Sequence, residues 1–341
     1  MIFSVISRLT SGILGIALFA ATSTPAFAQD EDAFQYNRLL GRGINLGAAL
    51  EGPQEGAWGV TLEADYFRLI KEAGFNSVRI PIRWSAHAST VAPYDIKADF
   101  FQRVDWAIEQ ALSRNLAAVI NVHHYEEMNQ NPVENLRRLV ELWKQIALHY
   151  QNQPKSLMFE LLNEPWLDDE SWQNAFPQLL KAVRDSNPDR IILIGPRVND
   201  VDRLDKMQLP PPDRRIIGTF HYYKPPQFTH QGAYWVKDSA PWRGTRWTGT
   251  PRERDELRKD FERAAAWSQQ NHRPLYLGEF GAYREANMDD RALWTRAVAR
   301  EAEKWGFSWS YWEFCSNFGA YDPAAQRWRR PLLNALLDKE N

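Results

Sequence analysis

The feature that most restricts the fold of this chain is an alternation of short apolar runs with longer segments of helical periodicity. Eight runs are β-branched or aromatic and nearly continuous in apolar character, as expected for strands that are covered on both faces. They span residues 41–47, 76–82, 116–124, 157–164, 190–196, 216–223, 274–281 and 307–314. Strands that alternate with helices pair in parallel through crossover connections. The alternation therefore predicts an α/β fold with one parallel sheet.

The segments between these runs carry helix signals. In the clearest, apolar residues recur on one face from Leu136 to Tyr150, after Asn131 and Pro132, which suit an N-cap and a first helical position. Weaker stripes span residues 100–111 and 257–268. Eight strand-helix repeats close naturally into a (β/α)8 TIM barrel, although an open doubly wound sheet would produce the same alternation. The first run is followed by no glycine-rich phosphate loop, which disfavours the open sheet.

The N-terminal residues 1–28 have the pattern of a cleavable signal peptide. Arg8 precedes an apolar run over residues 13–21, and the segment ends in Ala26-Phe27-Ala28. The apolar run is short for a membrane span, so a retained anchor is the weaker alternative. Because no linker, charge block or repeat divides the remainder, we expect one domain over residues 29–341, secreted or periplasmic, with no membrane partner. The single cysteine, Cys315, has no second thiol in the chain to pair with and is expected to be buried.

Composition narrows the class of partner. The formal net charge is −2, so the chain lacks the long-range field that nucleic acid or an anionic membrane surface would call for. The chain has 15 tryptophans and 13% aromatic residues, and such rigid, flat side chains can fill a core or provide stacking faces. A neutral ligand such as a sugar fits better than nucleic acid, and we expect a monomer.

Polar residues interrupt the apolar runs almost only at their C-terminal ends. In a barrel of this class those ends meet at one rim, where the active site is built. Scattered surface charges would not collect there. The residues are Arg79 on the second run, His123 and His124, Asn163 and Glu164, His221 and Tyr223, Glu279, and Trp312 and Glu313.

Two glutamates at this rim suit the hydrolysis of an acetal between sugars. One carboxylic acid must protonate the leaving oxygen, and one carboxylate must attack or activate water. Glu164 and Glu279 each follow an apolar run, so burial should disfavour the charged form unless a cation opposes it. We predict that Glu279, near Arg79 and the Tyr223 hydroxyl, is the ionised nucleophile. Glu164 is then predicted to keep its proton as general acid and to act later as base.

Six motifs, in this order, resemble glycoside hydrolase family 5, whose (β/α)8 retaining enzymes include many cellulases and β-mannanases. They are Val78-Arg79-Ile80-Pro81, Asn121-Val122-His123-His124-Tyr125, Leu162-Asn163-Glu164-Pro165, His221-Tyr222-Tyr223, Gly278-Glu279-Phe280-Gly281 and Tyr311-Trp312-Glu313-Phe314. The resemblance implies that Glu164 is the acid/base and Glu279 the nucleophile. It places Arg79 and Tyr223 beside the nucleophile, His221 beside the acid/base, His123 and Asn163 near the first subsites, and Trp312 as a stacking platform.

A further stretch of the sequence indicates which polysaccharides the chain could accept as substrates. Residues 228–235, which contain His230 and Trp235, resemble a bacterial endoglucanase group whose members often accept mannan as well as β-glucan. Those relatives commonly have asparagine where this chain has Ala48, so a sugar-hydroxyl contact is expected to be missing. Nearby Glu51 is expected either to bind a sugar hydroxyl or to solvate its loop. The loop tryptophans Trp84, Trp166, Trp235 and Trp312 are candidate sugar contacts.

Other readings of the same residues stay open. His123 and His124 suggest a metal, but adjacent strand residues point to opposite faces, so we expect neither a metal site nor another cofactor. By that alternation one of the two faces the cleft; the resemblance favours His123, and His124 could equally be a core residue. A silent carbohydrate-binding barrel is disfavoured because both glutamates are intact, and a transglycosylase would use the same residues.

These inferences favour a retaining endo-β-1,4-glucanase that acts on β-glucan or cellulose-type chains. A β-1,4-mannanase, or a dual glucanase and mannanase, is the close alternative. Direct attack leaves no space for a water molecule, so the two glutamate carboxyl groups should lie roughly 5 Å apart. A separation nearer roughly 8 Å would indicate an inverting enzyme.

Overall fold

A computed structural model describes residues 1–2 and 32–338 of the chain. The predicted signal peptide, residues 1–28, therefore lies outside the described residues except for its first two. The chain separates into two units, of which the second begins at Asp32 and holds the whole fold described below. Among the described residues, no helix has both the length and the apolar character that crossing a membrane requires.

Eight strands close into a barrel in the order β1 to β8, so the predicted (β/α)8 TIM barrel is confirmed. Every neighbouring pair is parallel, including β1 with β8, and each predicted run contains one strand. The strands are β1 (Arg42–Asn45), β2 (Ser77–Ile80), β3 (Ala117–Asn121), β4 (Leu157–Glu160), β5 (Ile192–Ile194), β6 (Ile216–Tyr222), β7 (Leu275–Phe280) and β8 (Ser308–Tyr311). A short hairpin follows, formed by β9 (Tyr321–Asp322) and β10 (Arg327–Trp328).

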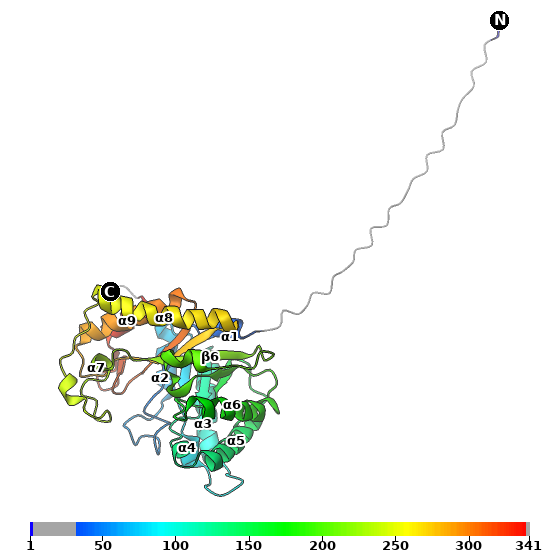
Figure 1. Cartoon of the computed structure of the whole chain (residues 1–341), viewed down its shortest axis with the longest axis horizontal. Coiled ribbons are helices and arrows are strands. Elements are labelled where there is room, and N and C mark those ends of the chain that lie inside the picture. Colours follow the sequence, from blue (N-terminus) through cyan, green and yellow to red (C-terminus); the bar gives the residue numbers. More distant parts are fainter. Residues whose placement is uncertain (3–31, 339–341) are drawn as a thin grey trace. The chain divides into compact units, whose positions relative to one another are not determined.

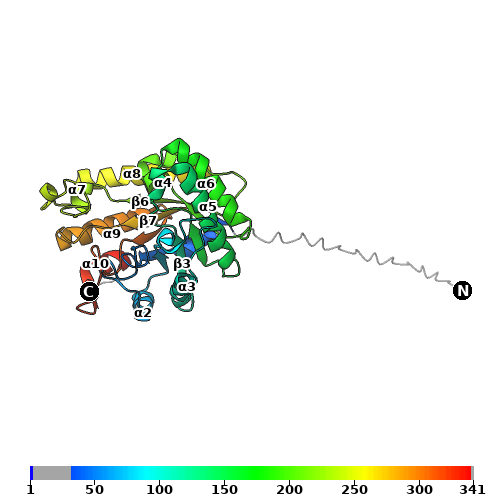
Figure 2. The same cartoon turned by 90° about the horizontal axis from the view of Figure 1, so that it is seen from below.

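Helices lie outside this barrel, and α8 and α9 run side by side in both views (Figures 1 and 2). The α-helices are α1 (Ala33–Leu40), α2 (Ala64–Ala73), α3 (Ala98–Leu112), α4 (Glu127–Gln130), α5 (Pro132–His149), α6 (Asp169–Arg184), α7 (Pro226–Thr229), α8 (Pro251–Asn271), α9 (Met288–Lys304) and α10 (Arg330–Leu337). Four short 3-10 helices are η1 (Trp84–His87), η2 (Arg197–Asn199), η3 (Val201–Lys206) and η4 (Ala240–Trp242).

Local sequence explains where the longer helices begin. The side chain of Asn131 accepts a hydrogen bond from Glu134 N, and Pro132 opens α5, as predicted. The predicted stripes at 100–111 and 257–268 lie in α3 and α8. Thr250 and Glu253 form a reciprocal capping box at the start of α8. These caps satisfy backbone N–H groups that the first turn leaves without partners.

The two largest hydrophobic clusters lie on opposite sides of the sheet, because alternate strand residues face opposite sides. The larger cluster lies between the sheet and the surrounding helices, and the smaller one fills the barrel interior. Helix α1, which sequence periodicity did not reveal, contacts β3, β6 and β8. Its residues Ala33, Tyr36 and Leu40 join the interior cluster. Because α1 leads directly into β1, it closes the barrel at the N-terminal ends of the strands, opposite the predicted active-site rim.

A buried arginine, Arg190, ties the end of α5 to the barrel. Its guanidinium donates to the backbone carbonyls of Tyr150, Gln153, Pro154 and Leu157, at 2.7–2.9 Å. Only 4% of the residue is exposed. One side chain thus satisfies four carbonyl oxygens in the turn before β4, where buried unpaired polar groups would be costly.

We expect Arg190→Leu to lower the free energy of unfolding by roughly 3 kcal/mol or more, because several buried carbonyls would lose their donors together. Urea unfolding followed by circular dichroism measures the change. Exposed Arg214 offers a control, since Arg214→Leu should change stability by less than about 0.5 kcal/mol. Equal effects of the two substitutions would contradict the role assigned to Arg190.

Candidate active site

The rim of the barrel is organised around one buried cation, Arg79 of β2, which is 0% exposed. Its Nε contacts Glu160 Oε2 at 2.7 Å, and its Nη1 contacts Glu279 Oε1 at 2.6 Å. Nη1 also donates to Asn45 Oδ1 at 2.9 Å, and Nη2 to Asn163 Oδ1 at 2.7 Å. Burial lowers the pKa of Arg79, but the two carboxylates raise it by more. The guanidinium therefore stays charged and links residues from β1, β2, β4 and β7.

Glu160 of β4, the second carboxylate that contacts Arg79, is fully buried. Its Oε2 accepts hydrogen bonds from Arg79 Nε and, at 3.0 Å, from Asn121 Nδ2. No substrate atom could reach it without displacing the residues above it. Glu160 thus acts as a counter-charge beneath the rim.

A bulge in β7 directs Glu279 toward Arg79. Phe220 of β6 pairs with Leu277, but the next residue, His221, pairs with Glu279, so Gly278 is an extra residue in β7. A Cβ atom on Gly278 would lie 3.0 Å from Thr219 Oγ1 and 3.2 Å from His221 Nε2. The close packing therefore favours glycine here, and the inserted residue resets the alternation of side chains along β7.

Glu279 is almost fully buried and is held at both carboxylate oxygens. Oε1 meets Arg79, and the Tyr223 hydroxyl donates to Oε2 at 3.0 Å. Burial and the neighbouring Glu279 carboxylate raise the pKa of Tyr223 well above its usual value. Tyr223 therefore remains a hydrogen-bond donor to Glu279.

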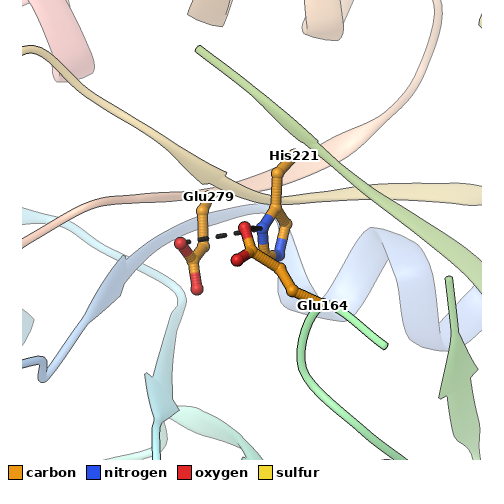
Figure 3. Close-up of side chains that lie close together, drawn as sticks. All are labelled: Glu164, His221 and Glu279. Atoms are coloured by element: carbon orange, nitrogen blue, oxygen red, sulfur yellow. Dashed lines mark hydrogen bonds and ion pairs between the residues drawn. The ribbon is translucent and has the colours of Figure 1, made fainter. Parts of the chain in front are cut away.

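Glu164 comes from another segment, and its carboxylate lies beside Glu279 and the His221 ring (Figure 3). It lies beyond the end of β4, has a φ of 41°, and exposes 34% of its side chain. His221 Nδ1 lies 2.9 Å from Glu164 Oε1 and 3.7 Å from Glu279 Oε2. One oxygen of each glutamate and one His221 nitrogen all lie within 4.8 Å of one another.

The prediction that burial alone keeps Glu164 protonated is wrong for the site without substrate. Burial does raise the pKa of Glu164, but its hydrogen bond with His221, with a further contribution from Arg79, lowers it by more. The net direction is downward. The sequence pattern pointed to Arg79 alone, because His221 lies on a different strand and its contact with Glu164 exists only in the folded barrel.

The expectation for His123 and His124 also needs correction. Both follow β3, which ends at Asn121, and His124 has a φ of 51°, so strand alternation does not apply to them. His123 is buried, accepts from Asn121 Nδ2 at Nδ1, and lies parallel to Trp312 with ring centroids 5.9 Å apart. Burial lowers its pKa well below the usual value, so it is neutral. His124 is partly exposed and pairs with Glu126 at 3.3 Å.

Glu51 is neither a sugar contact nor a solvated loop residue, because it is 1% exposed. Its carboxylate accepts from the backbone N–H groups of Ala48 and Ala49. Ala48 itself has a φ of 63°, a left-handed conformation that asparagine adopts more readily than alanine. In the loop after β8, buried Glu313 likewise accepts from the N–H groups of three residues, Cys315, Ser316 and Phe318.

Aromatic side chains stand around the two glutamates. Trp166, two residues after Glu164, is 60% exposed and lines a recess of about 50 Å³ together with His124 and Glu126. His230 packs edge-on against Tyr223 at 4.9 Å, and burial lowers its pKa to about 4. Trp58, Tyr234 and Trp235 are also exposed, whereas Trp84 is fully buried and is therefore excluded as a sugar contact.

The three central residues also have the donor types of a metal site. Glu164, His221 and Glu279 bring ligand atoms within 4.8 Å of one another, and no other such group occurs among residues 1–2 and 32–338. However, Arg79 and Tyr223 already donate to both oxygens of Glu279. A cation there would have to displace these donors and would face the Arg79 charge, so the arrangement suits acid-base chemistry better.

Three asparagines of the site were not singled out from the sequence. Asn45 and Asn121 end the apolar runs of β1 and β3, and this pattern could have revealed them, since it is the one that marked Glu164. Both are fully buried and contact Arg79 or Glu160. Asn199 lies in η2 after β5 and contacts His221 Nε2 at 3.1 Å. Nothing in its local sequence indicates that contact.

Residues 41–318 match the family described as Cellulase (glycosyl hydrolase family 5). The match covers most of the chain and all eight strands of the barrel. The chain belongs to glycoside hydrolase family 5. The family assignment agrees with the six motifs.

Two curated relatives of this family 5 member are larger proteins. Endoglucanase H of Acetivibrio thermocellus is 34% identical over 328 residues, which are 93% of this chain and 35% of that protein. The cellulase/esterase CelE of the same organism is 28% identical over 86% of this chain and 37% of its own length. The chain thus spans about a third of the length of these two relatives.

Solved structures of family 5 members align over nearly their whole length. Thermotoga maritima Cel5A in complex with cellobiose is 48% identical, with a TM-score of 0.88 over 90% of this chain and 100% of that chain. The same enzyme has been solved with mannotriose. Cellulose synthase subunit Z from Clostridioides difficile is 38% identical, with a TM-score of 0.84 over 87% of this chain and 99% of that one.

The stability of this family 5 member is expected to depend on pH through two buried loop residues, Glu51 and Glu313. Burial raises the pKa of Glu51 and of Glu313 from 4.5 to about 7. At a pH between 4.5 and about 7, each of these carboxyl groups is deprotonated in the unfolded chain but keeps its proton in the folded chain. The free energy of unfolding should therefore fall as pH rises from about 4.5 to 7, by up to about 3 kcal/mol for each group, and level off above.

Glu313→Gln removes one of these titrations, so its stability should vary less than that of the wild type across this pH range. Urea unfolding at several pH values measures the difference. Glu63→Gln, at an exposed position before α2, is the matched control and should follow the wild-type pH dependence. A Glu313→Gln curve parallel to the wild type would show that Glu313 does not titrate in this window.

Proposed function

We propose that this chain is a retaining endo-β-1,4-glucanase in which Glu279 attacks the sugar and Glu164 transfers the proton. The observation that carries the proposal is the pair of facing carboxylates, with oxygens within 4.8 Å of each other. Retaining glycosidases hold their carboxyl groups about 5–5.5 Å apart, whereas inverting enzymes leave about 6.5–9.5 Å for a water molecule. The two carboxylates also differ, because the buried guanidinium of Arg79 contacts only Glu279.

In the first step a carboxylate oxygen of Glu279 bonds to the anomeric carbon as the glycosidic C–O bond breaks. Glu164 gives its proton to the leaving oxygen. In the second step water attacks the same carbon, Glu164 takes a proton from that water, and the bond to Glu279 breaks. Sugar with retained configuration leaves, and both glutamates return to their starting states.

The environment supports this exchange of roles for Glu164. Before the first step the negative charge of Glu279 favours a proton on Glu164, since two nearby carboxylates resist ionising together. Once Glu279 is esterified, that charge is gone, while the contacts of Glu164 with His221 remain. The pKa of Glu164 should therefore be lower in the covalent intermediate, which suits it to act as base.

Substrate preference rests on the relatives and on the aromatic rim. The relatives are described as endoglucanases, and one of them has been solved with both cellobiose and mannotriose. We therefore propose β-1,4-glucan as substrate, with β-1,4-mannan as the alternative that Ala48 leaves open. Reducing-sugar release on carboxymethylcellulose, barley β-glucan, xyloglucan, xylan and galactomannan would separate the two. Product analysis with added sugar acceptors would reveal a transglycosylase.

The proposal extends to location and partners. The pattern of residues 1–28 supports export through a cleaved signal peptide, which would place the enzyme in the periplasm or outside the cell. A neutral polysaccharide as partner, with no cofactor, nucleic acid or membrane, agrees with the formal net charge of −2. We propose that the enzyme acts as a monomer.

The two glutamates can be assigned by chemical rescue. Glu279→Ala should reduce turnover by about 1000-fold or more, and azide should then yield the α-glycosyl azide from an activated aryl cellobioside. Glu164→Ala should instead yield the β-glycosyl azide, because azide would then attack the covalent intermediate. NMR of the products distinguishes the two anomers.

Glu170→Ala, which removes an exposed carboxylate near the start of α6, serves as the control and should leave turnover and products unchanged. If both catalytic variants gave the same anomer, the assignment of roles would fail. If wild-type enzyme released sugar with inverted configuration, the retaining mechanism itself would be refuted.

Trp166 is expected to stack against a sugar on the leaving-group side, because it follows the proposed proton donor and is exposed beside it. Trp166→Ala should raise KM for polysaccharide about threefold to tenfold, roughly 1 kcal/mol. An aryl cellobioside has no sugar on that side, so its kcat/KM should hardly change. Leu39→Ala on α1, another exposed apolar side chain, is the control and should affect neither substrate.

A further inference from the structure

The two ring nitrogens of His221 have different partners. Nδ1 lies 2.9 Å from Glu164 Oε1, and Nε2 lies 3.1 Å from the side-chain nitrogen of Asn199. An amide nitrogen can only donate, and a neutral imidazole carries one N–H and one bare nitrogen. With the amide nitrogen of Asn199 facing Nε2 and the ring neutral, Nε2 accepts from Asn199, and the single ring proton lies on Nδ1, facing Glu164.

Asn199 is held in place by a strained loop. It is fully buried and has a φ of 48°, and the preceding residue, Val198, has a φ of 49°. A left-handed conformation is unfavourable for a β-branched residue and costs about 1–3 kcal/mol. Two backbone hydrogen bonds of 2.9 Å hold this turn, from Val198 N to Pro165 O and from Asn199 N to Pro196 O. The first ties it to the residue after Glu164.

The surroundings of the Asn199 side chain indicate that its NH2 group makes the functional contact, which is the one with His221 Nε2. A Cβ atom on Gly195 would lie 2.3 Å from Asn199 Oδ1, so glycine at the end of β5 makes room for the side chain. Asn199 Oδ1 has no hydrogen-bond partner among the described residues. An unpaired buried oxygen is costly, and so is the strained turn. Stability alone does not account for an asparagine here, whereas its contact with His221 does.

We propose that Asn199 is a positioning residue that keeps the proton of His221 on Nδ1. This inference rests on the proposed function, since it concerns the acid/base Glu164. With Nδ1 protonated, His221 donates to Glu164 Oε1 and cannot accept the catalytic proton there. The proton of Glu164 is thereby directed to Oε2 and remains available to the leaving oxygen. Asn199 would thus act on the reaction through His221 without touching the sugar.

The protonation of the His221 ring can be observed directly. In ¹⁵N-histidine-labelled full-length protein at about pH 7, NMR should show a protonated Nδ1 and a bare Nε2, with the signals assigned by their loss in His221→Gln. Asn199→Asp places an acceptor at Nε2, so that nitrogen should become protonated. A protonated Nε2 in the wild type, or no change in the variant, would overturn the proposal. The wild-type measurement stands even if the variant fails to fold.

Kinetics separate positioning from a structural role. Asn199→Asp should lower kcat by about tenfold or more for cellobiosides with poor leaving groups, since general acid catalysis contributes roughly 10²–10⁴-fold. A dinitrophenyl cellobioside needs little protonation and should lose less than about threefold. Equal losses on both substrates would contradict the proposal. Asn115→Asp is the matched control, because Asn115 is an exposed asparagine with a φ of 56° far along the chain from the site.

These outcomes also distinguish this inference from the proposed function. If wild-type enzyme is inactive on every glycoside, the proposed function fails, yet the NMR experiment still decides whether Asn199 controls His221. If wild-type enzyme is active and Asn199→Asp alters neither the ring nitrogens nor the leaving-group dependence, only the present inference fails.

Discussion

The ion pairs of Arg79 in the middle of the barrel are the interaction on which the rest of the site depends. A fully buried guanidinium is tolerated only if counter-charges and hydrogen-bond acceptors surround it, and Glu160, Glu279, Asn45 and Asn163 supply them. These partners come from three further strands and one loop. The contacts that hold Glu279 in place therefore also join separate strands of the barrel, and removing either carboxylate would leave charge uncompensated in the interior.

The proposed catalytic groups lie where the backbone departs from regular structure. Glu164 and Asn199 have left-handed backbone conformations, and Glu279 follows a bulge at Gly278. Regular strands would place alternate side chains on opposite faces and could not direct three such groups at one point. The strained residues persist because buried contacts on all sides hold them, as expected at functional sites.

Four glutamates near the rim share a residue type but differ in state because their surroundings differ. Glu279 meets a cation and a hydroxyl, and Glu164 meets His221, whose hydrogen bond lowers the pKa of Glu164. Glu51 and Glu313 are almost fully buried and accept hydrogen bonds from backbone N–H groups, and burial raises the pKa of each to about 7. The first pair is suited to catalysis, whereas the second pair orders the loops after β1 and β8.

The sequence by itself determined the barrel, its eight strands and the two facing glutamates, because apolar periodicity and strand-end polar residues are local patterns that a parallel barrel converts into one rim. It did not determine α1, whose apolar residues have meaning only once an open barrel end exists to be filled. Nor did it reveal the downward shift in the pKa of Glu164 or the burial of Glu51. The link from Asn199 through His221 to Glu164 joins loops and strands that are far apart along the chain. Only tertiary structure decided these features, since hydrogen bonding, desolvation and charge depend on distances in space that no local pattern records.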